Sequence, residues 1–160
     1  MRHLSEPTIR HLDRAACEAF LAQQSVGRIA FSIHDRVDIE PLLYVFVRGW
    51  IYGRTQPVRK VDVLSHHRWV AFEVDEVEGP FEWRSVVVHG AWYSMAAAAP
   101  GELAEWEAGL AALRALTPTA FTKEDPIPFR AVVFRIHVAE VSGREYQLSA
   151  SNPSLSANRT

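Results

Sequence analysis

Short runs in which apolar residues alternate with polar ones recur along the chain, and they constrain its fold more than any other feature. Six runs have this β-strand character, and turn residues or helical stretches separate them. They cover residues 28–33, 37–47, a short segment from residue 51, 69–77, 83–94 and 129–145. The pattern predicts a mainly β (α+β) protein, a small antiparallel barrel of six strands with flanking helices. An open α+β sheet with helices on one face is the alternative.

Three helices are expected between or outside these runs. Asp13 is a suitable N-cap for a helix that ends near Gln24, and Pro57 suits the first turn of a short helix that ends near Leu64. Residues 95–116 are helical by composition. The sequence therefore predicts one domain at residues 13–147, an N-terminal arm at 1–12 and a flexible tail at 148–160.

The composition excludes several classes of protein. The chain has 160 residues and a formal net charge of −2, which argues against a general nucleic-acid binder. Cys17 is the only cysteine, so an internal disulfide and a multi-cysteine metal site are excluded, and the histidines show no HExxH pattern. The N-terminus lacks the apolar core of a signal peptide and no stretch is typical of a membrane span, so we expect a cytoplasmic protein.

The segment IYGRTQPVRK at residues 51–60 carries the clearest chemistry. A strand that begins at Ile51 is followed by a helix start at Pro57, and three cations and a hydroxyl lie at this junction: Arg54, Thr55, Arg59 and Lys60. Charge-assisted donors and free N–H groups at a helix N-terminus are what a phosphate group needs. A turn with solvated basic residues is the structural alternative.

Pro41 interrupts the second predicted strand. Proline cannot donate a hydrogen bond to a neighbouring strand, so it predicts a bulge or a sheet edge. A bulge would also leave backbone groups free for a ligand. Gly90 in the fifth predicted strand likewise indicates a bulge or a sharp corner of the barrel.

Three stretches together resemble a known family. They are GRIAFSI followed by IEPLLYVFV, the IYGRTQPVRK segment with VAFEVDE after it, and WRSVVVHG. Their order resembles that of the flavin-binding split-barrel proteins related to pyridoxamine 5′-phosphate oxidase, nearest to the small flavin-binding proteins similar to nitroimidazole-resistance reductases. The terminal FRIHVAEVSGRE is similar to the last strand of that branch, so the resemblance spans Asp13 to Glu145.

The resemblance implies a six-stranded split barrel that forms a homodimer with FMN in the clefts between the subunits. Arg59 and Lys60 would hold the FMN phosphate, with Thr55 near the ring or the phosphate. Other expected contacts come from the backbone of the segment that includes Pro41, Leu42 and Tyr44, from Arg84 and Ser85 against the cofactor, and from Arg135 of the facing subunit. The C-terminal arginine and tryptophan pattern that the oxidase uses around pyridoxal phosphate is not recognisable, which argues against pyridoxamine phosphate oxidation.

These features lead to two classes of function. The first is an FMN-dependent oxidoreductase that acts on a small flat acceptor such as a nitroaromatic or a quinone, with no catalytic side chain assigned. The second is a non-catalytic binding protein that uses the same barrel for a flavin, a deazaflavin or haem. Haem would need a ligand such as His66, His67 or His89.

Overall fold

The computed structural model describes residues 6–57, 59–95, 101 and 103–148, with only the backbone described at Arg59. These residues form eight strands and three helices. In chain order they are β1 (Pro7–Leu12), α1 (Arg14–Gln23), β2 (Val26–Ile33), β3 (Arg36–Val47), β4 (Trp50–Thr55), α2 (Arg59–His66), β5 (Trp69–Gly79), β6 (Glu82–Met95), α3 (Leu103–Leu116), β7 (Val132–His137) and β8 (Glu140–Leu148).

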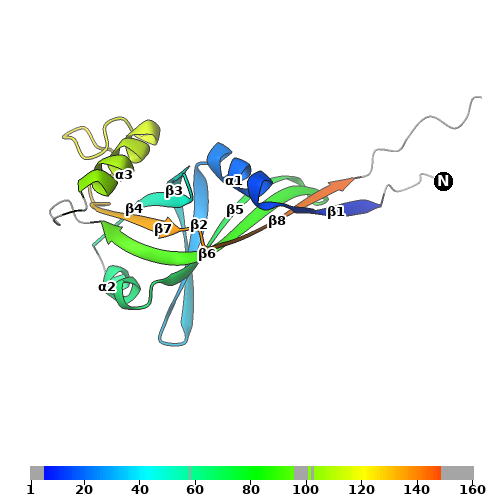
Figure 1. Cartoon of the computed structure of the whole chain (residues 1–160), viewed down its shortest axis with the longest axis horizontal. Helices are drawn as coiled ribbons and strands as arrows, with labels where there is room; N and C mark the ends of the chain where they lie inside the picture. Colours follow the sequence, from blue (N-terminus) through cyan, green and yellow to red (C-terminus); the bar gives the residue numbers. More distant parts are fainter. Residues whose placement is uncertain (1–5, 58, 96–100, 102, 149–160) are drawn as a thin grey trace, which may run out of the picture.

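Six of the strands close into a barrel, as the sequence predicts. The strands follow the order β6-β5-β2-β3-β4-β7, all neighbours are antiparallel, and pairing between β7 and β6 closes the ring. β8 and β1 lie outside the ring and extend from β6 toward one end of the molecule (Figure 1). The predicted fold class is therefore confirmed.

The long strand β6 divides its pairing between two partners, which splits the barrel. Its first part, Trp83–His89, pairs with β8, and its last part, Trp92–Met95, pairs with β7. Gly90 lies at the change of partner. A Cβ built there would lie 2.9 Å from the carbonyl carbon of His137 and closer still to its oxygen, so only glycine admits this approach.

The last predicted strand is wrong in one respect, because the run 129–145 is not continuous. It divides at Val138 and Ala139 into β7 and β8. The Val138 amide donates to the Gly49 carbonyl (3.0 Å) and the Ala139 amide to the His89 carbonyl (3.2 Å). These bonds turn the chain as it passes from one part of β6 to the other.

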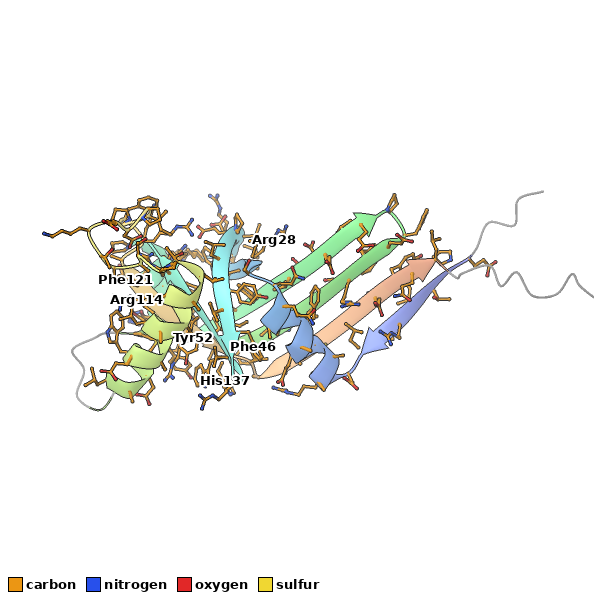
Figure 2. All side chains as sticks on the ribbon, turned by 90° about the horizontal axis from the view of Figure 1, so that it is seen from above. Arg28, Phe46, Tyr52, Arg114, Phe121 and His137 are labelled. Carbon is orange, nitrogen blue, oxygen red and sulfur yellow. The ribbon has the colours of Figure 1, made fainter. Side chains whose placement is uncertain are left out.

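The main hydrophobic core fills the barrel, and α1 covers it beside β3 and β8. Asp13 caps α1 as predicted, since its Oδ1 accepts a hydrogen bond of 2.8 Å from the Ala16 amide. Cys17, Phe20 and Leu21 are the buried side of that helix. A smaller second core lies under α3 and includes Tyr52 and Phe121. This helix lies at the end of the molecule away from β1 and β8 (Figure 2).

The N-terminal arm is ordered as a strand over residues 7–12. β1 pairs with β8 along its whole length, and Arg10 forms an ion pair with the buried Glu145. Residues 149–160, which make up nearly all of the predicted tail, lie outside the described part of the chain. None of the three described helices has the length and hydropathy that a membrane crossing requires.

Candidate cofactor-binding site

The candidate site lies where β4 ends and α2 begins. β4 is buried along most of its length because it pairs with β3 on one side and β7 on the other. It ends at Thr55, and the exposed Gln56 and Pro57 lead toward α2. The helix starts at Arg59 rather than at the predicted Pro57, so the proline lies in the connection before the helix.

A cavity of about 280 Å³ opens at this junction. It brings together five of the residues singled out in the sequence, namely Pro41, Leu42, Arg54, Thr55 and Lys60. Glu40, Gln56 and Arg130 complete its lining. Arg59 begins α2 beside this cavity in the sequence, but its side chain lies outside the described residues.

Lys60 is a largely enclosed cation in the lining of the cavity. Its side chain is 12% exposed and pairs with Glu40, whose side chain is 46% exposed. The ammonium also lies 5.6 Å from the centre of the Phe31 ring, which favours a cation there. The first turn of α2 adds backbone N–H groups that have no partner within the helix.

Arg54 lines the cavity, but its guanidinium is occupied by a buried ion pair. Nη2 and Nη1 donate to the two carboxylate oxygens of Asp125 at 2.6 and 3.3 Å, and Nε donates to the Arg130 carbonyl at 2.9 Å. The hydrogen bond from Arg54, together with those from the amides of Phe121 and Ile127, holds the pKa of Asp125 well below its usual range. Arg54 therefore anchors the segment between α3 and β7.

That anchoring places Arg130 beside the cavity, which sequence reasoning did not anticipate. Among the described residues, the Arg130 side chain has no hydrogen bond or ion pair, although its carbonyl accepts from Arg54. The Thr55 hydroxyl also has no partner in the described part of the chain. Nothing in the sequence near residue 130 marks this arginine. It is far from Thr55 along the chain, and the two residues come together only in the folded protein.

Pro41 lies on a free strand edge rather than in a bulge. The pairing of β2 with β3 runs from Val26↔Leu43 to Ile33↔Arg36 without a shift of register. β4 pairs with β3 only from Tyr44 onward, so this edge of β3 has no strand beside it at Pro41. Pro41 therefore lies at an edge, the second of the two predicted alternatives, and it lines the cavity.

Tyr44 points its side chain into the core. Its hydroxyl donates a hydrogen bond of 2.6 Å to the Leu21 carbonyl, and burial raises the pKa of the Tyr44 hydroxyl. Its ring packs edge-on against Phe72, with 5.1 Å between the ring centres. The whole residue is buried and its amide donates to the Ser25 carbonyl (2.9 Å), so neither the side chain nor the backbone of Tyr44 is open to a ligand, contrary to the expectation from the sequence.

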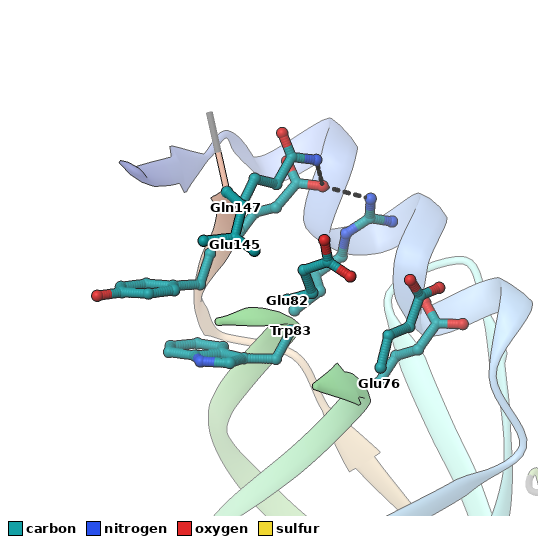
Figure 3. Close-up of a pocket in the computed structure, with 9 residues that line it drawn as sticks. Glu76, Glu82, Trp83, Glu145 and Gln147 are labelled. Carbon is teal, nitrogen blue, oxygen red and sulfur yellow. Dashed lines mark hydrogen bonds and ion pairs between the residues drawn. The ribbon is translucent and has the colours of Figure 1, made fainter. Parts of the chain in front are cut away.

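Arg84 and Ser85 lie away from the cavity at the β4–α2 junction. Arg84 donates a hydrogen bond of 2.7 Å to Glu145 and borders a separate cavity of about 270 Å³ (Figure 3). Glu145 also accepts from Gln147, and the hydrogen bond from Arg84 is the main reason why the pKa of Glu145 is lowered. The Ser85 hydroxyl donates to Glu73 at 3.3 Å on the outer face of the sheet.

Arg135 borders a third cavity, at the other end of α2. Of the three histidines considered for haem, His66 ends α2 and His67 follows it, whereas His89 is half-buried in β6. His66 Nδ1 lies 2.8 Å from the Asp62 carbonyl. No group of three or more metal-ligating side chains forms within the described residues.

The barrel and its motifs identify the family. Residues 13–145 match the protein family described as pyridoxamine 5′-phosphate oxidase. The chain belongs to this family, and the resemblance seen in the sequence is confirmed.

Solved structures share the same fold. A FAD-binding protein from Mesorhizobium loti is 26% identical, with a TM-score of 0.70 over 86% of this chain and 97% of that one. A Bacteroides thetaiotaomicron protein described as a candidate for 5-nitroimidazole antibiotic resistance has a TM-score of 0.64 over 92% of this chain and 96% of that one. At 16% identity, the second likeness concerns the fold alone.

One curated relative matches in part. The uncharacterized protein RA0666 of Rhizobium meliloti (strain 1021) is 26% identical over 89 residues, which are 56% of this chain and 59% of that protein. The match thus spans less than two thirds of the relative.

Proposed function

We propose that this protein binds FMN, with the phosphate at the β4–α2 junction and the ring along the free edge of β3. The observation that carries the proposal is the cavity that gathers Thr55, Lys60 and Arg130 beside the first turn of α2. Membership of the pyridoxamine 5′-phosphate oxidase family and the likeness to a FAD-binding protein support it.

The charges around the cavity fit a phosphate. The Arg54–Asp125 pair is neutral, which leaves the cations of Lys60 and Arg130 against one carboxylate. That carboxylate, Glu40, is half exposed, so it can turn to water while Lys60 changes its partner to the phosphate. This exchange of partners by Lys60 costs little free energy, because the Glu40 carboxylate is already partly solvated.

The ring needs a flat wall and polar backbone groups, and the β3 edge supplies both. The edge at Pro41 and Leu42 is not covered by β4, and Leu42 is buried beneath it. The cavity of about 280 Å³ lies just below the usual size of a ligand pocket, so one chain encloses only one end of the cofactor.

A second copy of the chain would supply the missing walls, which is our reason for proposing a homodimer. Apolar side chains are exposed on the outer sheet face beside the site, among them the cross-strand pair Val26 and Leu43. A matched face from a second subunit would bury them and close the cleft.

The proposed activity is oxidoreduction of a small flat acceptor such as a nitroaromatic or a quinone. Bound FMN supplies the hydride chemistry. The chain holds the phosphate through Lys60, presents the β3 edge to one side of the ring and leaves the other side open. We assign no catalytic side chain.

A spectrum of the purified protein, followed by chromatography of the released cofactor, tests the proposal. We expect flavin absorption and FMN in the released fraction. FAD is the second candidate, because the relative from M. loti is a FAD-binding protein, and chromatography separates the two. A Soret band would instead indicate haem, and failure to bind added FMN or FAD would contradict the proposal.

Lys60→Ala tests the phosphate contact. Loss of one charge-assisted hydrogen bond should weaken FMN binding by about 1.5–3 kcal/mol, or roughly 10- to 100-fold, as measured by quenching of flavin fluorescence. Lys123, the only other lysine, is exposed, so Lys123→Ala is the matched control and should bind FMN like the wild type. Equal loss in both variants would place the phosphate elsewhere.

Turnover is measured separately from binding. We expect an added quinone or nitroaromatic to reoxidise the reduced holoprotein faster than it reoxidises free reduced FMN. If it does not, the protein is a flavin carrier rather than an enzyme.

A further inference from the structure

The third cavity, which Arg135 borders, lies at the C-terminal end of α2, opposite the end that meets the β4–α2 junction. It has a volume of about 370 Å³, within the range of small-molecule pockets. The end of β6, the start of α3 and β7 form its other sides. Trp92, Tyr93 and Met95 provide an apolar wall.

Two residues that line this cavity carry buried polar atoms that have no partner among the described residues. Within the described part of the chain, three buried side-chain atoms lack a hydrogen bond: Nε of Arg84, Nε of Arg135 and Oε2 of Glu105. The last two residues both line this cavity, and no ion pair joins them. Native proteins pair nearly all such groups, so an unpaired donor and an unpaired acceptor on residues that line one cavity favour a ligand that supplies the opposite groups.

Two arginines are held in place by aromatic rings at this cavity. The Arg135 guanidinium lies 4.0 Å from the centre of the Trp50 ring, and the Arg68 guanidinium lies 5.1 Å from that of Tyr93. A guanidinium that stacks on a ring keeps the N–H groups at its edge free to donate. Two such guanidinium groups at one cavity suit a carboxylate or a phosphate group, which can accept two hydrogen bonds from each guanidinium.

We propose that this cavity binds a small organic anion that also carries a hydroxyl or amino group. The acid group lies between Arg68 and Arg135, and the hydroxyl or amino group donates to Glu105. The arginines alone would suit any anion, whereas Glu105 repels an anion that has no donor to offer. The cavity therefore selects a bifunctional molecule over a simple inorganic anion.

The test uses glycerol 3-phosphate, which has a phosphate and two hydroxyls, against sulfate, which has no hydrogen to donate at neutral pH. Both are titrated calorimetrically into the full chain. We expect glycerol 3-phosphate to bind about tenfold more tightly than sulfate, a preference that a charge-assisted hydrogen bond can supply. Arg68→Gln and Arg135→Gln should each weaken glycerol 3-phosphate binding by about tenfold, since each removes a charged guanidinium. Glu105→Ala should abolish the preference over sulfate.

The controls separate this cavity from the proposed flavin site. Arg36→Gln changes an exposed arginine on the β2–β3 hairpin and should have no effect. Lys60→Ala should leave glycerol 3-phosphate binding intact even where it impairs FMN binding. Arg68 is exposed, so Arg68→Gln should remain folded if Arg135→Gln does not.

Two results would overturn the proposal. One is the absence of binding by the wild type at millimolar glycerol 3-phosphate. The other is glycerol 3-phosphate binding that is weakened in Lys60→Ala and unchanged in Arg68→Gln. That result would show that the calorimetric signal comes from binding at the β4–α2 junction.

Discussion

At the scale of single residues, Arg54 shows how a side chain that is suited to a ligand can be committed to the fold. Its charge and position in the sequence favour phosphate binding, yet both carboxylate oxygens of Asp125 accept from it. The pair lies between β4 and the segment that follows α3, and it positions Arg130 at the cavity. Arg54 thus contributes to the site by holding its neighbours in place.

The Arg54–Asp125 pair should make stability depend on pH. The folded state lowers the pKa of Asp125, so the pair stabilises the protein above the ordinary carboxyl pKa of about 4 and its contribution is lost as the pH falls below that value. We expect the melting temperature of the wild type to fall more steeply between about pH 5 and about pH 3 than that of Asp125→Asn. Glu124→Gln, an exposed change in the same segment, should follow the wild type.

Tyr44→Phe separates a structural role from a role in binding. Loss of the buried hydrogen bond to the Leu21 carbonyl should lower the free energy of unfolding by about 1–1.5 kcal/mol in urea. Flavin affinity should stay unchanged because the side chain points into the core. Weaker flavin binding at unchanged stability would contradict this assignment.

At the scale of elements, β6 decides the architecture, because it pairs with β8 in its first part and with β7 in its last. The change of partner requires close contact between two backbones, at Gly90 and His137. A side chain at residue 90 would force β6 and β7 apart at the point where the barrel closes.

Gly90→Ala should therefore destabilise the protein severely, by about 3 kcal/mol or more, as measured by urea unfolding. Gly79→Ala is the matched control within the β5–β6 hairpin, since a Cβ there meets no atom within 4 Å. A loss of stability that is equal in the two variants would show that glycine matters for its flexibility rather than for the contact with His137.

At the scale of the whole molecule, the shallow cavity and the apolar outer face belong to one proposal. If a second copy completes the flavin site, dimerisation and cofactor affinity must change together. Leu43 is 43% exposed on that face, beside the cavity edge at Leu42. Leu43→Glu should give a monomer in light scattering and weaken FMN binding, while the circular dichroism spectrum stays native. A wild-type protein that is monomeric and binds FMN tightly would contradict the proposal.

Features that depend on a few neighbouring residues were determined by the sequence alone. They include the Asp13 cap, the alternation of the barrel strands and the β4–α2 junction with Lys60, because capping, side-chain alternation and turn chemistry act within one or two turns of chain. The tertiary structure decided that Arg54 pairs with Asp125, that Arg130 joins the cavity, and that the last run divides into β7 and β8. Each of these depends on residues that are far apart in the sequence and meet only when the barrel closes, so no local pattern records them.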